Sequence, residues 1–284
     1  MKKIIVIPNP TKDAGLAVTH KIISQLTSLG ILVYVDSSYF VEDEGVVSYA
    51  VCPTDADMIV VVGGDGSVID ASVLAIELDI PILGVNLGKV GYLSELEPEL
   101  LSKLSRLVDG DYTVQTRMLL SAEFITQEGE LLRSERFAVN DVVISQDRDF
   151  GIASFSVRNS RREEVNYRAN GIIVATPVGS TAYSLSAGGP IIAHNLESIT
   201  VTPLCPHSFF NRSIVYEPDE CITVINKGDA ILNINVDGRS FATMKRGEFC
   251  RVSRSKHTLR MITFSESNMF SALFKKIKVF ENQN

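Results

Sequence analysis

A run of five apolar residues, Met58 to Val62, leads directly into the tetrapeptide Gly63-Gly64-Asp65-Gly66. The run is unbroken and rich in β-branched residues, which is typical of a strand buried on both faces of a parallel sheet. The glycines after it predict a turn through positive φ, with a backbone that a phosphate group can approach closely. The tetrapeptide therefore places one carboxylate, that of Asp65, on a turn at the carboxyl end of a strand.

The stretch from Ser67 to Ile76 carries apolar residues at helical spacing, which predicts a helix that Ser67 opens. The first amides of such a helix favour an anion in front of them. A carboxylate beside an anion site could hold a polyphosphate and activate a neighbouring hydroxyl group. Gly-Gly-Asp-Gly is also a common turn sequence, and from this motif alone a purely structural turn stays an equal alternative.

Two other phosphate-binding motifs do not fit the sequence. The dinucleotide fingerprint G-x-G-x-x-G would need a glycine where the chain has Ile69. A Walker loop would need more residues between Gly84 and Gly88, and a Ser or Thr in place of Val90. The missing fingerprint disfavours an oxidoreductase of the Rossmann type.

Composition excludes several classes of function. The chain has 284 residues, 45% of them hydrophobic, which is enough for two modest domains or one large one. Its net charge of −7 argues against a nucleic-acid partner bound through a broad basic surface. The four cysteines form no Cys-x-x-Cys pair and the four histidines lack ligand spacing, so no protein-held metal site is expected. No segment is long and apolar enough to span a bilayer, and we expect a cytoplasmic protein without a membrane partner.

The first 113 residues alternate between strand and helix patterns. Strands are predicted at 3–7, 31–35, 58–62 and 82–85, and helices at 11–29, 67–76 and 98–109. Such alternation predicts a doubly wound α/β domain over residues 1–113, with ligands at the carboxyl ends of its strands. Helical spacing at 268–280 predicts a helical tail that packs back on this domain, so that residues 259–284 return to it.

Near Thr113 the pattern changes to the alternation of strands separated by turn residues. Strands are predicted at 119–125, 137–144, 153–157, 171–175, 221–225, 231–236 and 249–253. Residues 114–258 are therefore expected to form an all-β domain of two packed sheets, similar to a β-sandwich.

Two segments outside the glycine turn carry polar residues where ligands could bind. The loop from Gly84 to Leu93 has irregularly spaced glycines and could wrap a ligand, with Asn86 as a polar contact and Tyr92 as a stacking face. Asn140 and Asp141 interrupt an apolar strand, and an amide beside a carboxylate can hold vicinal ribose hydroxyls or a base edge. A structural loop in the first case, and a bulge or strand-end hydrogen bond in the second, stay open.

A second polar loop with glycines runs from Thr176 to Pro190, behind Arg168-Ala169-Asn170-Gly171 and an apolar strand. It offers hydroxyl groups and backbone amides together at Gly179-Ser180-Thr181, and Tyr183 could stack or pack on a base. Ser180 as the nucleophile of a hydrolase is a weaker alternative, because the glycines that flank a nucleophile elbow are missing.

Taken together and in their order along the chain, the glycine turn and the polar loops resemble the motifs of the NAD kinase family, also called ATP-NAD kinases. The resemblance rests on residues 63–67, 84–93, 140–141 and 176–190, and residues 7–13 and 202–208 are similar to further family segments. It implies transfer of the terminal phosphoryl group of ATP, or of polyphosphate, to the 2′-hydroxyl of the adenosine ribose of NAD. The product would be NADP, and Mg²⁺ on the donor phosphates would neutralise charge during the transfer.

The resemblance assigns Asp65 the role of general base or of the group that orients the hydroxyl. A carboxylate within hydrogen-bond reach can accept the proton of a ribose hydroxyl as the bond to phosphorus forms. The donor phosphates would be held by the glycine turn, that is by Gly63, Gly64 and Gly66.

On the acceptor side, the resemblance implies that Asn140 and Asp141 hold the adenosine or the ribose hydroxyls of NAD. Arg168 and Asn170 would lie near the nicotinamide half. The NAD pocket would be lined by Thr181, Ala182, Tyr183 and Ser186. A neighbouring subunit would complete this pocket, so the resemblance also implies a homodimer or a homotetramer.

The sequence departs from the family pattern at three places. Asn170 stands where the family often has Asp, Val178 replaces a common Thr, and Asn211-Arg212-Ser213 stands where Arg-Pro is usual. These departures bear on fine specificity, such as NAD against NADH, rather than on the reaction.

Two other functions remain open at this point. A lipid kinase of the diacylglycerol-kinase type shares the Gly-Gly-Asp-Gly turn, but the polar loops of the second domain argue against its apolar acceptor. A non-catalytic dinucleotide sensor is the second, and the intact Asp65 argues against it.

Overall fold

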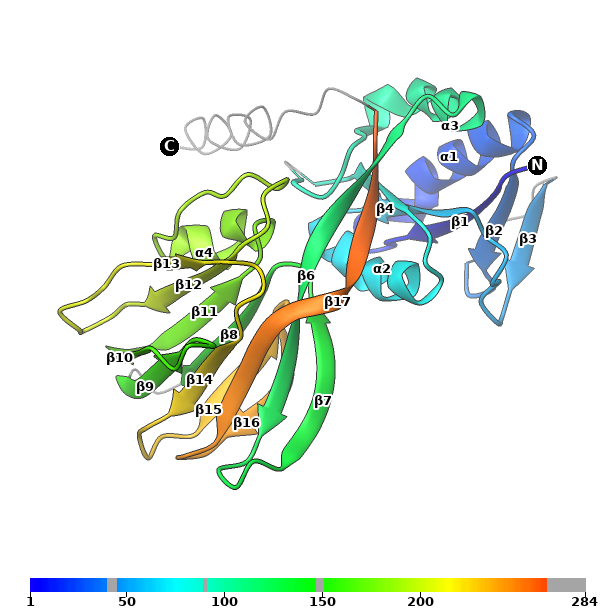
Figure 1. Ribbon diagram of the computed structural model, residues 1–284. Coiled ribbons are helices and arrows are strands. Elements are labelled where there is room, and N and C mark those ends of the chain that lie inside the picture. Colours follow the sequence, from blue (N-terminus) through cyan, green and yellow to red (C-terminus); the bar gives the residue numbers. More distant parts are fainter. Residues whose placement is uncertain (40–44, 89–90, 147–150, 265–284) are drawn as a thin grey trace. The chain divides into compact units, whose positions relative to one another are not determined.

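The computed structural model describes residues 1–39, 45–88, 91–146 and 151–264 (Figure 1). Two compact units divide the chain. Unit 1 is Met1–Thr116 with the described residues from Leu259 on, and unit 2 is Arg117–Thr258. The chain passes between the units within β6 (Thr113–Ile125) and again within β17 (Phe249–Thr263). The helix expected at 268–280 lies outside the described residues.

Unit 1 is built on a parallel sheet with the strand order β3-β2-β1-β4-β5-β17. The strands are β1 (Lys3–Pro8), β2 (Leu32–Asp36), β3 (Val46–Tyr49), β4 (Met58–Gly63) and β5 (Ile82–Asn86), joined by the end of β17. Every residue of β4 and of β5 is buried, as the unbroken apolar runs predicted.

Helices cover both faces of this sheet (Figure 1). The helices are η1 (Ala14–Leu16), α1 (Ala17–Ser28), α2 (Asp65–Glu77), η2 (Pro98–Ser105) and α3 (Arg106–Asp109). Buried residues of α1, η2 and α3 share one core with alternate residues of the strands, whereas α2 lies on the opposite face (Figure 1). The expected doubly wound α/β fold of this part is confirmed.

The helix that follows β1 lies on one face of the sheet and the helix that follows β4 lies on the other, although β1 and β4 are neighbours in the sheet. Such a reversal opens a crevice at the carboxyl ends of the two strands, where ligands of doubly wound sheets bind. The strand order thus selects the turns after Pro8 and Gly63 as the place to examine for a site.

Two predicted helix starts are wrong for local reasons. The helix expected from residue 11 begins at Ala17, after the short 3₁₀ turn η1, and the buried carboxylate of Asp13 accepts N–H bonds from Val18 (3.0 Å) and Thr19 (2.8 Å) in its first turn. The helix expected to open at Ser67 begins two residues earlier, with Asp65 inside its first turn.

Unit 2 consists of two antiparallel sheets. In the first, β10-β9-β14-β17 lie in that order, and β6 pairs with β17 and with β7. The second has the order β13-β12-β11-β8-β15-β16. The bounds are β7 Leu131–Ala138, β8 Asp141–Gln146, β9 Ala153–Arg158, β10 Glu164–Ala169, β11 Gly171–Ala175, β12 Ile199–Leu204, β13 Ile214–Tyr216, β14 Ile222–Asn226, β15 Leu232–Val236 and β16 Arg239–Met244.

A single apolar core lies between these two sheets. It combines Leu120 and Phe155 of the first sheet with Ile172 and Ile234 of the second, all of them buried. The expected β-sandwich-like fold of this part is confirmed. The outer face of the second sheet carries a short 3₁₀ helix, η3 (Gly179–Thr181), and a short helix, α4 (Tyr183–Ser186), with Ala187 packed on buried strand residues.

The strand predicted at 137–144 is wrong, because it is two strands. Strand β7 ends at Ala138 and β8 begins at Asp141. Between them, the backbone N–H groups point to the carboxylate of Asp237, as described below. Strands β3, β10, β12, β13 and β16 were not predicted. Strands β3 and β13 have only four and three residues, too few to show a period, whereas β10 does alternate polar and apolar residues and was missed.

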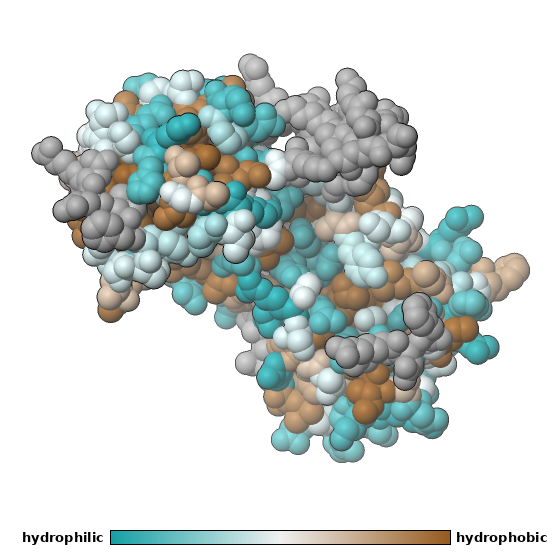
Figure 2. Space-filling model, turned by 180° about the vertical axis from the view of Figure 1, so that it is seen from behind, coloured by the Kyte–Doolittle hydropathy of each residue, from teal (hydrophilic) through white to brown (hydrophobic). Residues whose placement is uncertain are grey.

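Large apolar side chains that remain exposed are distributed over several elements, among them Val51, Leu196 and Phe209. The face shown in Figure 2 likewise intersperses hydrophobic and hydrophilic residues. Single exposed apolar residues are normal on a protein surface and need no partner to explain them. Within the described ranges, no helix has the length and apolar character needed to cross a membrane.

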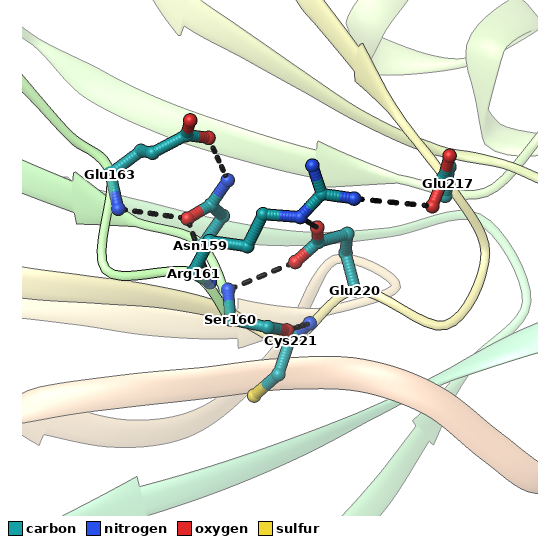
Figure 3. Close-up of polar contacts among 7 residues, drawn as sticks. All are labelled: Asn159, Ser160, Arg161, Glu163, Glu217, Glu220 and Cys221. Carbon is teal, nitrogen blue, oxygen red and sulfur yellow. Dashed lines mark hydrogen bonds and ion pairs between the residues drawn. The ribbon is translucent and has the colours of Figure 1, made fainter.

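The turn between β9 and β10 is tied to the segment before β14 by a group of polar contacts (Figure 3). Glu220 accepts a hydrogen bond from the backbone N–H of Ser160 at 2.9 Å, and the Ser160 hydroxyl accepts one from the N–H of Cys221 at 2.8 Å. Arg161 lies 3.9 Å from Glu220 and 4.0 Å from Glu217. Hydrogen bonds from Ser160 hold the pKa of the Glu220 carboxyl below its usual value.

We expect Glu220→Gln to lower the free energy of unfolding at pH 7 by about 1 kcal/mol, because a charge-assisted hydrogen bond is lost. A lowered folded-state pKa stabilises the fold above the unfolded-state pKa, and this stabilisation is lost as the pH falls through the folded-state value. Urea unfolding at pH 7 and at pH 2.5, below the folded-state pKa, should show a deficit of the variant that is larger at pH 7 than at pH 2.5. Glu217→Gln is the control, since the Glu217 side chain is 80% exposed; an equal deficit in both variants contradicts the assignment.

Candidate active site

In unit 1, the turns after β1 and β4 are joined by the side chain of Asn9. Its Nδ2 donates to the Ser67 hydroxyl at 2.7 Å, and its backbone N–H donates to the Val62 carbonyl at 2.9 Å. Its Oδ1 accepts hydrogen bonds from the Thr11 backbone at 3.1 Å and from the Thr11 hydroxyl at 2.6 Å. The turns after β1 and β4 are therefore fixed to each other.

The glycine turn needs space rather than an unusual backbone conformation. A Cβ at Gly63 would overlap the Ser67 side chain, and one at Gly64 would overlap the Nζ of Lys12. Gly64 has a φ of −117°, and neither Gly63 nor Gly66 has positive φ, so the predicted turn through positive φ is wrong. At Gly66 a Cβ would meet nothing within 4 Å, which leaves the start of α2 open to a ligand.

Lys12 brings a positive charge to this turn. Its side chain is exposed and its ammonium group lies directly against the backbone of Gly64. The cation thus stands at the start of α2, where the helix amides already favour a negative charge. Sequence reasoning included Lys12 in a family-like segment but gave it no role, because only the fold brings residues 12 and 64 together.

Asp65 connects this turn to the loop after β5. Its Oδ2 accepts a hydrogen bond from the N–H of Tyr92 at 2.9 Å, and its Oδ1 accepts one from the N–H of Leu93 at 3.1 Å. A Cβ at Gly91 would lie 2.9 Å from Oδ1, so this close approach requires glycine there. Each carboxylate oxygen has two lone pairs, so the two backbone bonds orient the group without exhausting its capacity to accept.

The other two residues expected in this loop, Asn86 and Tyr92, have different surroundings. Asn86 is 7% exposed, and its side chain bonds to the backbone of Gly88, with Oδ1 accepting at 2.9 Å and Nδ2 donating at 3.1 Å. This amide therefore shapes the loop. Burial, and next the charge of Asp65, raise the pKa of the Tyr92 hydroxyl, which stays neutral.

In unit 2, the segment between β7 and β8 is held by one carboxylate. Asp237 accepts hydrogen bonds from the backbone N–H groups of Val139 (2.8 Å), Asn140 (2.8 Å) and Asp141 (3.1 Å). Burial raises the pKa of Asp237, and these three hydrogen bonds oppose the rise. Asp237 was recognised in the sequence only as a turn residue, and nothing local signals its contact with residues about 100 positions earlier.

Asp141 is the most strongly perturbed carboxyl group of this region. Its side chain is 5% exposed. Burial, and next the negative charge of Asp237, raise its pKa to about 7, while a hydrogen bond from the N–H of Tyr183 acts in the opposite direction. The group therefore changes its charge near neutral pH, a property that functional sites often share.

The loop that starts at Thr176 is packed against Asn140. The Thr176 hydroxyl donates to the Val139 carbonyl at 2.7 Å, and the Thr176 N–H donates to the Asn140 carbonyl at 2.9 Å. A Cβ at Gly179 would overlap that same carbonyl, so only glycine fits. Ser180 is fully buried and its hydroxyl donates to the Pro177 carbonyl at 2.6 Å, which argues against a role as an exposed nucleophile.

The expected pocket residues of this loop differ in exposure. Thr181 is buried and its hydroxyl donates to the Val178 carbonyl at 2.9 Å. Ala182 is half-buried, Ser186 is exposed, and Tyr183 is 49% exposed, so its ring is free to stack on a ligand. The structure thus brings Asn140, Asp141 and Tyr183 to one place on the second sheet.

Arg168 and Asn170 lie at the junction of β10 and β11. The Arg168 carbonyl accepts a hydrogen bond from the N–H of His207 at 2.7 Å, and its N–H donates to the Ser208 hydroxyl at 2.7 Å. The Asn170 N–H donates to the Leu204 carbonyl at 2.9 Å. Both residues are therefore positioned by the segment 204–208, which lies within the family-like residues 202–208.

Comparison with known proteins decides the family. Residues 4–112 match the model of the ATP-NAD kinase N-terminal domain, and residues 139–264 match that of the ATP-NAD kinase C-terminal domain. This chain belongs to the NAD kinase family. The resemblance seen in the sequence is confirmed, and the chain is an enzyme of a phosphotransferase family.

Relatives and solved structures of the NAD kinase family extend over nearly the whole chain. The NAD kinase of Geobacter sulfurreducens is 36% identical over 283 residues, which cover 98% of this chain and 99% of that protein. The NAD kinase of Natranaerobius thermophilus is 34% identical, with 98% of both chains covered.

Among solved structures, an NAD kinase from Archaeoglobus fulgidus in complex with ATP has a TM-score of 0.75 at 25% identity and covers 97% of this chain and 98% of its own. Yeast NADH kinase complexed with NADH has a TM-score of 0.81 at 19% identity, covering 96% of this chain and 86% of its own, which shows the shared fold. These matches do not favour the lipid-kinase or sensor alternatives.

Because the folded state raises the pKa of Asp141, the native protein keeps a proton that the unfolded chain releases above pH 4. The contribution of this group to stability therefore falls as the pH rises from about 4 to about 7. We expect Asp141→Asn to reduce this decline by a few kcal/mol at most, as measured by urea unfolding between pH 4.5 and 7.5. Asp219→Asn serves as the control, because Asp219 is 87% exposed; an unchanged pH dependence in Asp141→Asn contradicts the burial argument.

Proposed function

We propose that this NAD kinase family member transfers the terminal phosphoryl group of ATP to the 2′-hydroxyl of the adenosine ribose of NAD and releases NADP. The observation that carries this proposal is the position of Asp65 at the carboxyl end of β4, on the turn that Lys12 contacts. It combines a proton acceptor with a cation at the start of a helix. Polyphosphate is a second donor with the same terminal chemistry.

The donor phosphates would lie over Gly64 and Gly66, at the start of α2. Lys12 would neutralise part of their charge as a point cation, and the open side of Gly66 leaves room for their oxygens. Bound Mg²⁺ would supply the remaining charge neutralisation. This ion would be held by the donor phosphates, which leaves the Asp65 carboxylate to act on the ribose hydroxyl.

Asp65 would accept the proton of the ribose hydroxyl, or orient that hydroxyl, as the new bond to phosphorus forms. The N–H groups of Tyr92 and Leu93 already fix the direction of its two oxygens. Pre-orientation of this kind lowers the barrier because little rearrangement remains for the transition state. Positioning and charge neutralisation dominate phosphoryl transfer, and this turn offers both.

NAD would be held by unit 2. Asn140 and Asp141 would bind ribose hydroxyls or the adenosine, and Tyr183 would stack on the base. The remaining proposed contacts are Thr181, Ala182 and Ser186 around the pocket, with Arg168 and Asn170 toward the nicotinamide half. We also propose that a second subunit completes this pocket in a homodimer or homotetramer, and that the enzyme acts in the cytoplasm.

We expect Asp65→Asn to lower kcat by at least about 100-fold while NAD binding changes little, because the amide cannot accept the hydroxyl proton. NADP formation is measured by coupling it to an NADP-specific dehydrogenase, and NAD binding by calorimetry. Asp79→Asn is the matched control, an exposed carboxylate just beyond the end of the same helix.

The outcome for the native enzyme separates the alternatives. If it forms no NADP with either ATP or polyphosphate, the proposal fails and a nucleotide sensor is favoured. If it phosphorylates a lipid instead, a lipid kinase is favoured.

We expect Lys12→Ala to lower kcat/KM for ATP by about 10- to 100-fold, the effect of losing one cation from a phosphate site. The KM for NAD should change less than twofold, and Lys12→Arg should restore part of the loss. Lys21→Ala, an exposed lysine on α1, is the control. Equal effects on the ATP and NAD parameters would contradict a role at the donor phosphates.

A further inference from the structure

An open cavity of about 540 Å³ in unit 2 is lined by three basic side chains, Arg158, Lys227 and Arg246. They come from three separate places, the end of β9 and the two turns beside β14 and β16. Ile225 and Phe249 add apolar surface to the lining, and none of the described residues that line it is acidic. No step of the proposed reaction uses this cavity.

The lining of the cavity is a rigid construction. The side chain of Asn226, fully buried, donates to the carbonyls of Ala230 (2.7 Å) and Met244 (3.1 Å), and accepts from the N–H of Gly228 at 3.0 Å. The Asn226 carbonyl accepts a hydrogen bond from the N–H of Gly247 at 2.8 Å. The backbones of the turns that carry Lys227 and Arg246 are thereby fixed to each other, so both side chains start from fixed positions on the cavity lining.

The acidic partners of these cations are weakly held. Arg158 lies 2.5 Å from Glu164, and Arg246 lies 2.8 Å from Asp229, but all four side chains are at least 30% exposed. Exposed ion pairs stabilise a protein by only about 0 to 1 kcal/mol, so a multivalent anion can replace these carboxylates. The chain as a whole carries a net charge of −7 and repels anions, which makes a local cluster of three cations a specific feature.

This cavity is separate from the residues proposed to bind NAD in the same unit. Asp237 follows the Val236 end of β15, whereas Met244, to which Asn226 is bonded, pairs with Leu232 at the other end. Four residue steps along a strand correspond to about 13 Å. An anion in the cavity would therefore not contact the Asp141 and Asp237 carboxylates.

We propose that this cavity is a second anion site, which binds a small oligophosphate through Arg158, Lys227 and Arg246. Guanidinium groups bind phosphate oxygens in pairs, and an ammonium group adds a point charge, so the set suits a chain of several phosphates better than a single one. A free oligophosphate and the phosphate chain of a nucleotide share this chemistry.

Titration of the full ¹⁵N-labelled chain with inorganic tripolyphosphate, at constant ionic strength, tests the proposal by NMR. We expect saturable shifts of the amide signals of Lys227, Gly228 and Gly247. The double substitution Lys227→Ala/Arg246→Ala should weaken the affinity read from Gly247 at least tenfold. A parallel titration with ATP distinguishes the two sources, because a nucleotide site would bind ATP more tightly than tripolyphosphate.

The control is Arg239→Ala/Arg254→Ala, which removes the same charge from unit 2 but not from the cavity. It should weaken the affinity less than twofold, and Lys227→Arg/Arg246→Lys should retain it, which excludes loss of the fold as the cause. The absence of saturable shifts at these amides, or an equal loss in both double-alanine variants, overturns the proposal. The readout needs no catalysis, so it is independent of the NAD kinase activity.

Discussion

The two hydrogen bonds that Asp65 accepts from the backbone of Tyr92 and Leu93 hold the site of unit 1 together. They fix the first turn of α2 to the loop after β5, and they set the direction of the carboxylate. The Asn9 side chain connects a third loop to these two, because it joins the turn after β1 to Ser67. Because these bonds replace contacts with water, each of the three loops depends on the other two for its conformation.

In unit 2, too, one carboxylate accepts hydrogen bonds from backbone N–H groups. The carboxylate of Asp237 accepts three backbone N–H groups and so ends one strand and starts the next. This interruption places Asp141 under the loop that carries Tyr183, where burial raises its pKa. In both units a carboxylate satisfies backbone donors that no strand or helix can satisfy, and polar residues then become available at a fixed position.

Much of the fold follows from local patterns, and particular residues show where such patterns stop being informative. The apolar runs of β4 and β5 predicted buried parallel strands, and the change of period near Thr113 predicted the β-rich part. Five strands were missed, of which β3 and β13 are too short to show a period, while the alternation in β10 was present but was not used. The expected positive φ does not occur at Gly63 or Gly64, and Gly63 is instead required because a Cβ there would overlap the Ser67 side chain at the start of α2.

The sequence by itself determined the family and the identity of the acidic residue on the glycine turn, because these lie in contiguous motifs with a characteristic order. Tertiary structure alone decided that Lys12 contacts Gly64, that Asp237 holds the start of β8, and that three basic residues from one strand end and two turns line one cavity. The physical reason is the range of the interactions. Propensity and periodicity act between neighbours in the chain, whereas steric exclusion, charge and hydrogen bonding act between neighbours in space, which a linear pattern does not specify.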